Sequence, residues 1–167
     1  MKSMKSLIAS ICILAMFGMT LGMIAKAADT ATVTATVTVQ NISVSVTDGT
    51  VTYGTLAQNS TKNTCDLTDT QTATNNGNVT ENFNIKGQNS TNWTLGATAG
   101  SDIYTHKFST ATCPTFTGTA LTISYQSLAT SIAPSGTKSF DLEINTPNPS
   151  TVFTVQSVDV TVQAVAG

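Results

Sequence analysis

The chain has 167 residues, a formal net charge of −2 and no Arg, so all seven of its basic residues are Lys. This composition lacks the basic footprint of a nucleic-acid-binding protein, and it lacks the usual bidentate ligand of phosphates and carboxylates. Thirty-three residues are Thr. Because β-branched Thr and Val favour the half-buried surface of a sheet, we expect an almost entirely β chain with no nucleic-acid partner.

Residues 1–27 have the pattern of a secretory signal peptide. Two Lys residues make the start positive, residues 7–24 form an uncharged apolar run, and the small-x-small sequence AKA ends at Ala27. We therefore expect cleavage after Ala27, a single mature domain over residues 28–167, and contact with the membrane only through the signal segment before cleavage. Because the apolar run has 18 residues, an uncleaved N-terminal anchor is the alternative.

The next segment, residues 30–40, has the alternation of a β-strand, and we call it the assembly strand. Its apolar side chains fall on odd positions, namely Ala31, Val33, Ala35, Val37 and Val39. From Ile42 onward the apolar positions are even, so the phase changes at Gln40-Asn41. When extended, the uncharged residues 31–39 reach about 30 Å. Monomeric proteins usually avoid such an open edge, so we expect an additional N-terminal strand that pairs with a sheet.

Residues 42–47 and 50–56 flank Asp48-Gly49, a favoured two-residue hairpin turn. We expect the two segments to pair across this turn. That register places four apolar side chains on one face, those of Val44, Val46, Val51 and Tyr53.

The rest of the chain repeats short alternating segments between turns rich in Gly, Pro, Asn and Asp. We expect strands over residues 69–74, 79–86, 92–98, 103–109, 119–126, 138–145 and 152–165. The last of these also changes phase, at Gln156-Ser157. About ten short strands without a helical segment predict an all-β fold, specifically an Ig-like antiparallel β-sandwich with the additional N-terminal strand.

Two cysteines, Cys65 and Cys113, follow the predicted signal peptide. An even pair in an exported chain most often forms a disulfide, so we expect one here, with two separate thiols as the alternative. A single His and the lack of a closely spaced Cys pair do not favour a metal site. We expect no cofactor.

No residue pattern in the sequence specifically indicates a catalytic site. His106 is the only imidazole, and its place in an alternating segment is typical of a residue on a sheet face. Asp66 with Asp69 and Glu81 with Glu143 are the available carboxylate pairs for glycoside hydrolysis, but their spacing is not specific. We therefore do not expect an enzyme or a catalytic site.

Two binding sites are weaker possibilities in the sequence. Trp93 is a candidate platform for a sugar ring, although a lone Trp in a strand more often belongs to a core. Asp66, Asp69 and Asp102 are candidate calcium ligands, but they do not form an ordered calcium loop. We expect no metal site.

Three segments resemble parts of the Ig-like sandwiches of prokaryotic cell-surface proteins. They are DGTVTYGTLAQNST, TQTATNNGNVTENFNIKG and APSGTKSFDLEINTP. In layout the chain is most similar to secreted fibre-forming sandwiches of the TasA/camelysin type and, more loosely, to pilins of chaperone-usher systems. The pair Cys65 and Cys113 is not part of the TasA-type pattern. The resemblance implies a structural subunit that polymerises by passing a strand to its neighbour.

Two arrangements of the assembly strand are open at this point. It completes either the sheet of a neighbouring copy or a sheet of its own chain, because terminal strands of sandwiches also change phase where they cross between sheets. We expect a homopolymer built by β-strand addition, located outside the cell or at its surface. The alternative is a monomeric surface module that binds a glycan or a protein.

Overall fold

The computed structural model describes residues 29–167, so the predicted signal peptide, residues 1–27, lies outside the described residues. Residues 38–167 form a compact unit distinct from the chain before it. In the described range the one helix is α2 (Thr64–Leu67). No helix among these residues is long and apolar enough to cross a membrane.

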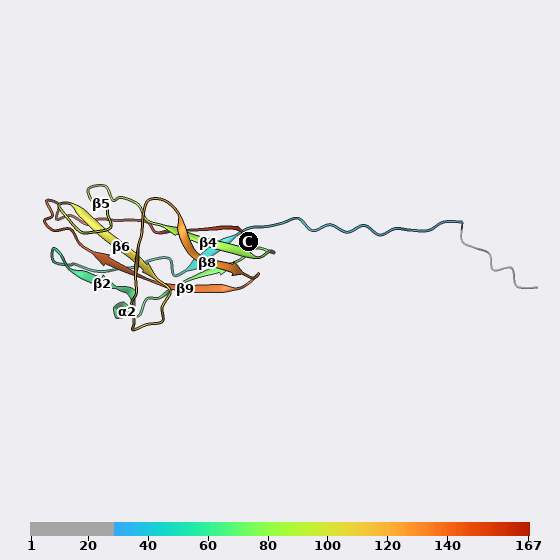
Figure 1. The fold of residues 1–167 in the computed structure, drawn as a ribbon, viewed down its shortest axis with the longest axis horizontal. Helices are drawn as coiled ribbons and strands as arrows, with labels where there is room; N and C mark the ends of the chain where they lie inside the picture. Colours follow the sequence, from blue (N-terminus) through green and yellow to red (C-terminus); the bar gives the residue numbers. More distant parts are fainter. Residues whose placement is uncertain (1–28) are drawn as a thin grey trace, which may run out of the picture. The chain divides into compact units, whose positions relative to one another are not determined.

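Two β-sheets make up the compact unit (Figure 1). Their strands are β1 (Val44–Thr47), β2 (Thr61–Asn63), β3 (Gln71–Asn75), β4 (Glu81–Lys86), β5 (Thr94–Leu95), β6 (Ile103–Ser109), β7 (Thr119–Ala120), β8 (Gln126–Ile132), β9 (Thr137–Asn145) and β10 (Thr161–Ala166). The larger sheet has the order β1-β3-β9-β6-β5, with β2 paired to β9 and β7 paired to β6. The smaller sheet has the order β10-β4-β8. The all-β prediction is confirmed, although β5 and β6 pair in parallel.

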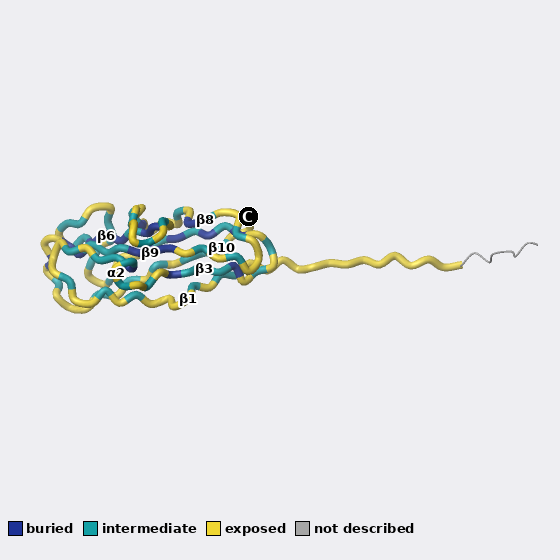
Figure 2. The backbone as a smooth tube through the Cα atoms, turned by 90° about the horizontal axis from the view of Figure 1, so that it is seen from below, coloured by how far each residue is buried: buried dark blue, intermediate teal, exposed yellow. Residues whose placement is uncertain are grey.

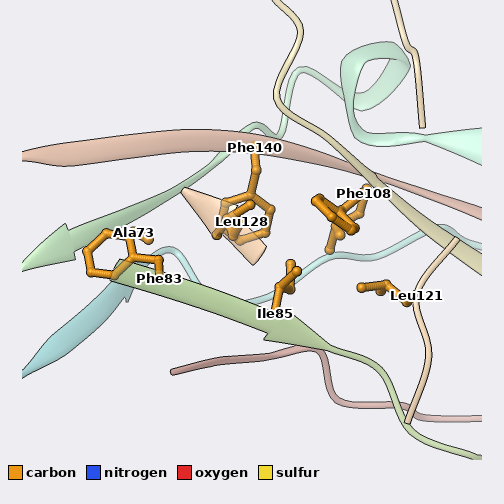
Figure 3. Close-up of a cluster of buried hydrophobic side chains, with 8 residues drawn as sticks. Ala73, Phe83, Ile85, Phe108, Leu121, Leu128 and Phe140 are labelled. Atoms are coloured by element: carbon orange, nitrogen blue, oxygen red, sulfur yellow. The ribbon is translucent and has the colours of Figure 1, made fainter. Parts of the chain in front are cut away.

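The core lies between the two sheets and depends on alternation along the strands. Every second residue of β3 and of β4 is buried, and Phe83 and Ile85 of β4 are completely so. Figure 3 shows these two side chains among partners from the other strands. The buried cluster consists of Ala73, Phe83, Ile85, Phe108, Leu121, Leu128, Phe140 and Leu142. Burying one such large apolar side chain contributes roughly 1.5 to 3 kcal/mol to folding.

Five predicted strands are confirmed, with small changes at their ends. They are the segments 42–47, 69–74, 79–86, 103–109 and 138–145, which correspond to β1, β3, β4, β6 and β9. The segment 119–126 divides into β7 and the start of β8, because Gln126 closes a loop by donating from Nε2 to the carbonyl of Ala120 at 3.0 Å. Of the segment 92–98, only β5 pairs.

The predicted hairpin is wrong. β1 pairs with β3 instead of with residues 50–56, and its Val44 lies opposite Asn75. Residues 50–56 form no strand.

The turn that motivated the hairpin is nevertheless present. Asp48 and Gly49 both have positive φ, 70° and 68°, and the Gly49 amide donates to Gln71 Oε1 at 3.0 Å. After the turn, Val51 packs against the core together with Val44 and Val46 of β1, as predicted. Burial of Val51, rather than pairing with β1, therefore determines the path of the chain after the turn.

The structure contains the predicted disulfide between Cys65 and Cys113, which joins α2 to the loop after β6. The buried carboxylate of Asp141 lies beside it. Asp141 Oδ1 accepts hydrogen bonds from Thr64 Oγ1 at 2.7 Å and from Thr70 Oγ1 at 2.8 Å. The bridge attaches the segment around α2 to that loop, and the hydrogen bonds attach it to β9.

Replacing both cysteines by Ser should lower the free energy of unfolding by about 4 kcal/mol, because the bridge closes a loop of 48 residues in the unfolded chain. Chemical denaturation of the wild type and of the Cys65→Ser/Cys113→Ser variant measures the difference. Reductant should destabilise the wild type to a similar extent and leave the double variant unchanged. Equal stabilities with and without the bridge would contradict the prediction.

Candidate functional site

Two irregular segments of the compact unit have no strand partner. They are residues 50–57, the first wall, and residues 151–160, the second wall. In the described chain neither wall belongs to a sheet or makes a backbone-to-backbone hydrogen bond. The prediction of a strand over residues 152–165 is therefore correct only for β10, which continues directly from the second wall.

Side-chain contacts hold both walls at one end. The carbonyl of Ala57 in the first wall accepts from Thr146 Oγ1 at 2.6 Å. The amide of Thr151 in the second wall donates to Asp102 Oδ1 at 2.7 Å, and hydrogen bonds from Thr151 lower the pKa of Asp102. The walls are thus positioned without a ladder. In the second wall, side chains also bond to main-chain groups of Val152, Thr154 and Val155.

A groove separates the two walls. It consists of two hollows of about 320 Å³ and 720 Å³ that share several lining residues from both walls. Phe140, Leu142 and Ile144 of β9 form much of its floor. The narrower hollow adds Val158 and Val160 from the second wall. We call these two hollows the assembly groove.

The assembly groove is lined by both apolar and polar residues and is almost uncharged. Among its lining residues, all within the described part of the chain, Asp159 is the one with a formal charge. Phe153 and Val155 of the second wall are 80% and 97% exposed, so they leave apolar surface at its rim. Its chemistry suits an uncharged, extended and apolar ligand.

The second wall also leads to an open sheet edge. β10 is the outer strand of the smaller sheet and has β4 as its neighbour on one side. An outer strand offers a row of unpaired backbone donors and acceptors to any further strand. A strand in the assembly groove can thus extend the smaller sheet.

His106 and Tyr53 lie at the floor of the groove. His106 is 3% exposed, and its Nε2 lies 3.1 Å from Tyr53 Oη, within hydrogen-bonding distance. Burial lowers the pKa of His106 from its usual 6.5 to about 4, so the ring is neutral at pH 7. Burial, followed by the charges of Asp69 and Glu143, raises the pKa of Tyr53. Both groups therefore keep the floor uncharged.

Trp93 lines the wider hollow, and it is half-buried rather than presented as a flat platform. Its Nε1 donates to Ser150 Oγ at 3.2 Å, and its ring is tilted against Tyr104 with centroids 6.2 Å apart. Both its polar edge and one face are thus engaged inside the fold.

The candidate carboxylates Glu81 and Glu143 lie in different sheets. Glu81 lies buried in the smaller sheet, whereas Glu143 lies in the larger sheet and forms an ion pair with Lys107 at 3.0 Å. Asp69 accepts from Gln71 Nε2 at 2.7 Å. Its pKa is raised by desolvation and by the nearby charge of another carboxylate, Asp48.

One group in the described chain has the composition of a metal site. It combines Cys65, Cys113 and Asp141, whose potential ligand atoms lie within 4.8 Å of one another. The two sulfurs are bonded to each other in the disulfide, so they do not offer the thiolates that a metal would require.

The assembly strand is exposed over its whole length. Figure 2 colours residues 30–40 as exposed, and no strand is assigned among them. Val33 and Val37 are 94% and 92% exposed, and Val39 is 80% exposed.

Comparisons with known proteins leave the family open. No family model matches the chain, and neither a curated protein nor a solved structure matches it.

Acid should destabilise the fold through His106. In the unfolded chain its imidazole takes up a proton as the pH falls below 6.5, whereas the native ring resists protonation down to about pH 4. This contribution to stability is complete above pH 6.5 and decreases by about 3 kcal/mol as the pH falls to 4. Urea denaturation at pH 7 and pH 4 measures the loss.

The His106→Gln variant is the control for this effect, since carboxylates also destabilise proteins in acid. Between pH 7 and pH 4 its free energy of unfolding should decrease by about 3 kcal/mol less than that of the wild type. An equal loss in both proteins would show that His106 does not cause it.

Proposed function

We propose that the chain is a secreted structural subunit of an extracellular filament, pilus or matrix fibre, in which the assembly strand of one copy fills the assembly groove of the next. The groove is the observation that carries this proposal. Two walls without strand partners flank an almost uncharged floor that includes Phe140, Leu142 and Ile144. An added β-strand is a ligand that satisfies main-chain groups and apolar pockets together.

The assembly strand has the matching chemistry. Its odd positions carry three Val and two Ala, and its even positions from 32 to 38 carry Thr. In an extended chain the odd side chains face the groove floor while the Thr side chains face water. Burying the five apolar side chains contributes roughly 5 to 8 kcal/mol before ordering costs are subtracted.

The lengths also agree. Residues 31–39 are nine residues, as are those of β9, which provides much of the floor. Nine extended residues span about 30 Å. The donated strand can therefore follow β9 along its length.

The same proposal accounts for the strand order. An Ig-like sandwich has strands A, B, E and D in one sheet and C, F and G in the other. The order β1-β3-β9-β6 corresponds to A-B-E-D, while β4 and β10 correspond to C and F. Strand G would lie beside β10. We propose that the fold is Ig-like and that the neighbouring copy supplies strand G.

Such a contact produces a filament. Each copy gives a strand at one place and receives a strand at another, so the interface joins two different surfaces. A head-to-tail contact of this kind continues indefinitely unless its rotation closes a ring.

Deleting residues 28–40 from the mature chain should abolish assembly, because it removes the donated strand and leaves both sheets and the disulfide intact. Negative-stain microscopy and size-exclusion chromatography should show filaments for the mature wild type and folded monomers for the deletion. Filaments formed by the deletion variant would refute strand donation. A wild type that stays monomeric would favour the surface-module alternative.

A charge in the assembly strand should block assembly only where the side chain faces the groove. Val37→Asp should reduce polymerisation by at least tenfold, because it places an unpaired carboxylate against an apolar floor. Thr36→Asp is the matched control, since it adds the same charge on the outward face. Light scattering during assembly compares the two variants. Equal inhibition by both would contradict the proposed orientation.

A further inference from the structure

The phase change at Gln40-Asn41 coincides with a cluster of polar contacts from the loop between β3 and β4. The Asn41 amide donates to Asn78 Oδ1 at 2.8 Å. Asn78 Nδ2 donates to the carbonyl of Val39 at 2.9 Å, and the Asn78 amide donates to the carbonyl of Asn41 at 3.1 Å. One residue thus binds three main-chain groups at the base of the assembly strand.

The contacts continue up to the start of β1. The carbonyl of Ser43 accepts from the Asn76 amide, and the Ser43 amide donates to Glu81 Oε1, both at 2.8 Å. Asn76 Nδ2 also donates to Ser45 Oγ at 2.8 Å. Residues 39–43 are therefore attached to the β3–β4 loop and to Glu81 by two backbone hydrogen bonds and by the side chains of Asn78 and Glu81.

Gly77 permits this close approach. A Cβ atom at this position would overlap the carbonyl oxygen of Asn41 and the Glu81 carboxylate. Any larger residue would push the base of the assembly strand away from the loop.

We propose that Asn78 is a positioning residue for polymerisation, which fixes the C-terminal end of the assembly strand where it joins the compact unit. This inference rests on the proposed function. An anchored base leaves fewer residues to be ordered when the strand enters a neighbouring groove, so it reduces the entropic cost of each addition. Without the Asn78 contacts, residues 39–41 join the chain segment that must be ordered at each addition. The donated strand is then less closely linked to the compact unit that receives the next strand.

The first test is amide hydrogen exchange in a full-length mature monomer. Val37→Asp supplies this monomer, and Asn78→Ala is added to it. Exchange at Asn41 should become about tenfold faster, because its amide loses its acceptor. Exchange at Ser43, which uses Glu81, should change much less. Unchanged exchange at Asn41 would overturn the anchor.

The second test measures the rate of filament elongation. In an otherwise wild-type chain, Asn78→Ala should slow filament elongation by at least threefold. Asn89→Ala is the matched control, because it removes one exposed hydrogen bond, from the Leu95 amide at 2.9 Å, outside the anchor. Faster exchange at Asn41 with wild-type elongation would overturn the role in polymerisation.

A synthetic peptide of residues 29–41 then measures the groove alone. The Val37→Asp monomer should bind it with the same affinity whether or not Asn78→Ala is present, because Asn78 does not line the groove. A structural defect would weaken peptide binding along with elongation and so overturn a positioning role. Failure of both monomers to bind the peptide would overturn the proposed function itself, and this inference with it.

The Gly77→Ala variant should remove the same anchor by a different substitution. It should release the base of the assembly strand while leaving the Asn78 side chain in place. Slower elongation with unchanged peptide binding by its Val37→Asp form supports the anchor, and elongation at the wild-type rate would overturn it.

Discussion

Backbone hydrogen bonding determines this architecture, because every extended segment must find partners for its N–H and C=O groups or leave them to water. β3, β4, β6 and β9 each have a strand on both sides, and they supply most of the buried cluster. The two groove walls and the assembly strand have no strand partners. Folding is thus concentrated in four central strands, and the proposed association depends on three unpaired segments.

The same division explains what could be predicted from the sequence. The strands that were predicted well are β1 and the four central strands, and in β3 and β4 burial falls on every second side chain. The hairpin after β1 was wrong because alternation predicts which face Val51 presents but not which strand it joins. The inward orientation of Val51 was predicted correctly, whereas the strand partner of β1 depended on β3 and the core.

The candidate site was only partly accessible to this reasoning. The assembly strand stood out because its alternation is uncharged and unbroken. The groove could not be predicted, because it lies between two segments that have strand-like sequences but no strand partner. Exposed Phe153 and Val155 were visible only as part of an ordinary strand pattern. The loop around Asn78 was interpreted as a turn, and nothing in its composition indicated a contact with residues 39–41.

The position of Trp93 has a spectroscopic consequence. It is the one tryptophan of the chain, so all indole emission arises from the wall of the wider hollow. Its Nε1 is fixed by Ser150, while the hollow around its ring is open. Any occupant that displaces water from this hollow would shift the emission to shorter wavelengths. The fluorescence of Trp93 can therefore report whether the groove is filled, and no dye has to be attached.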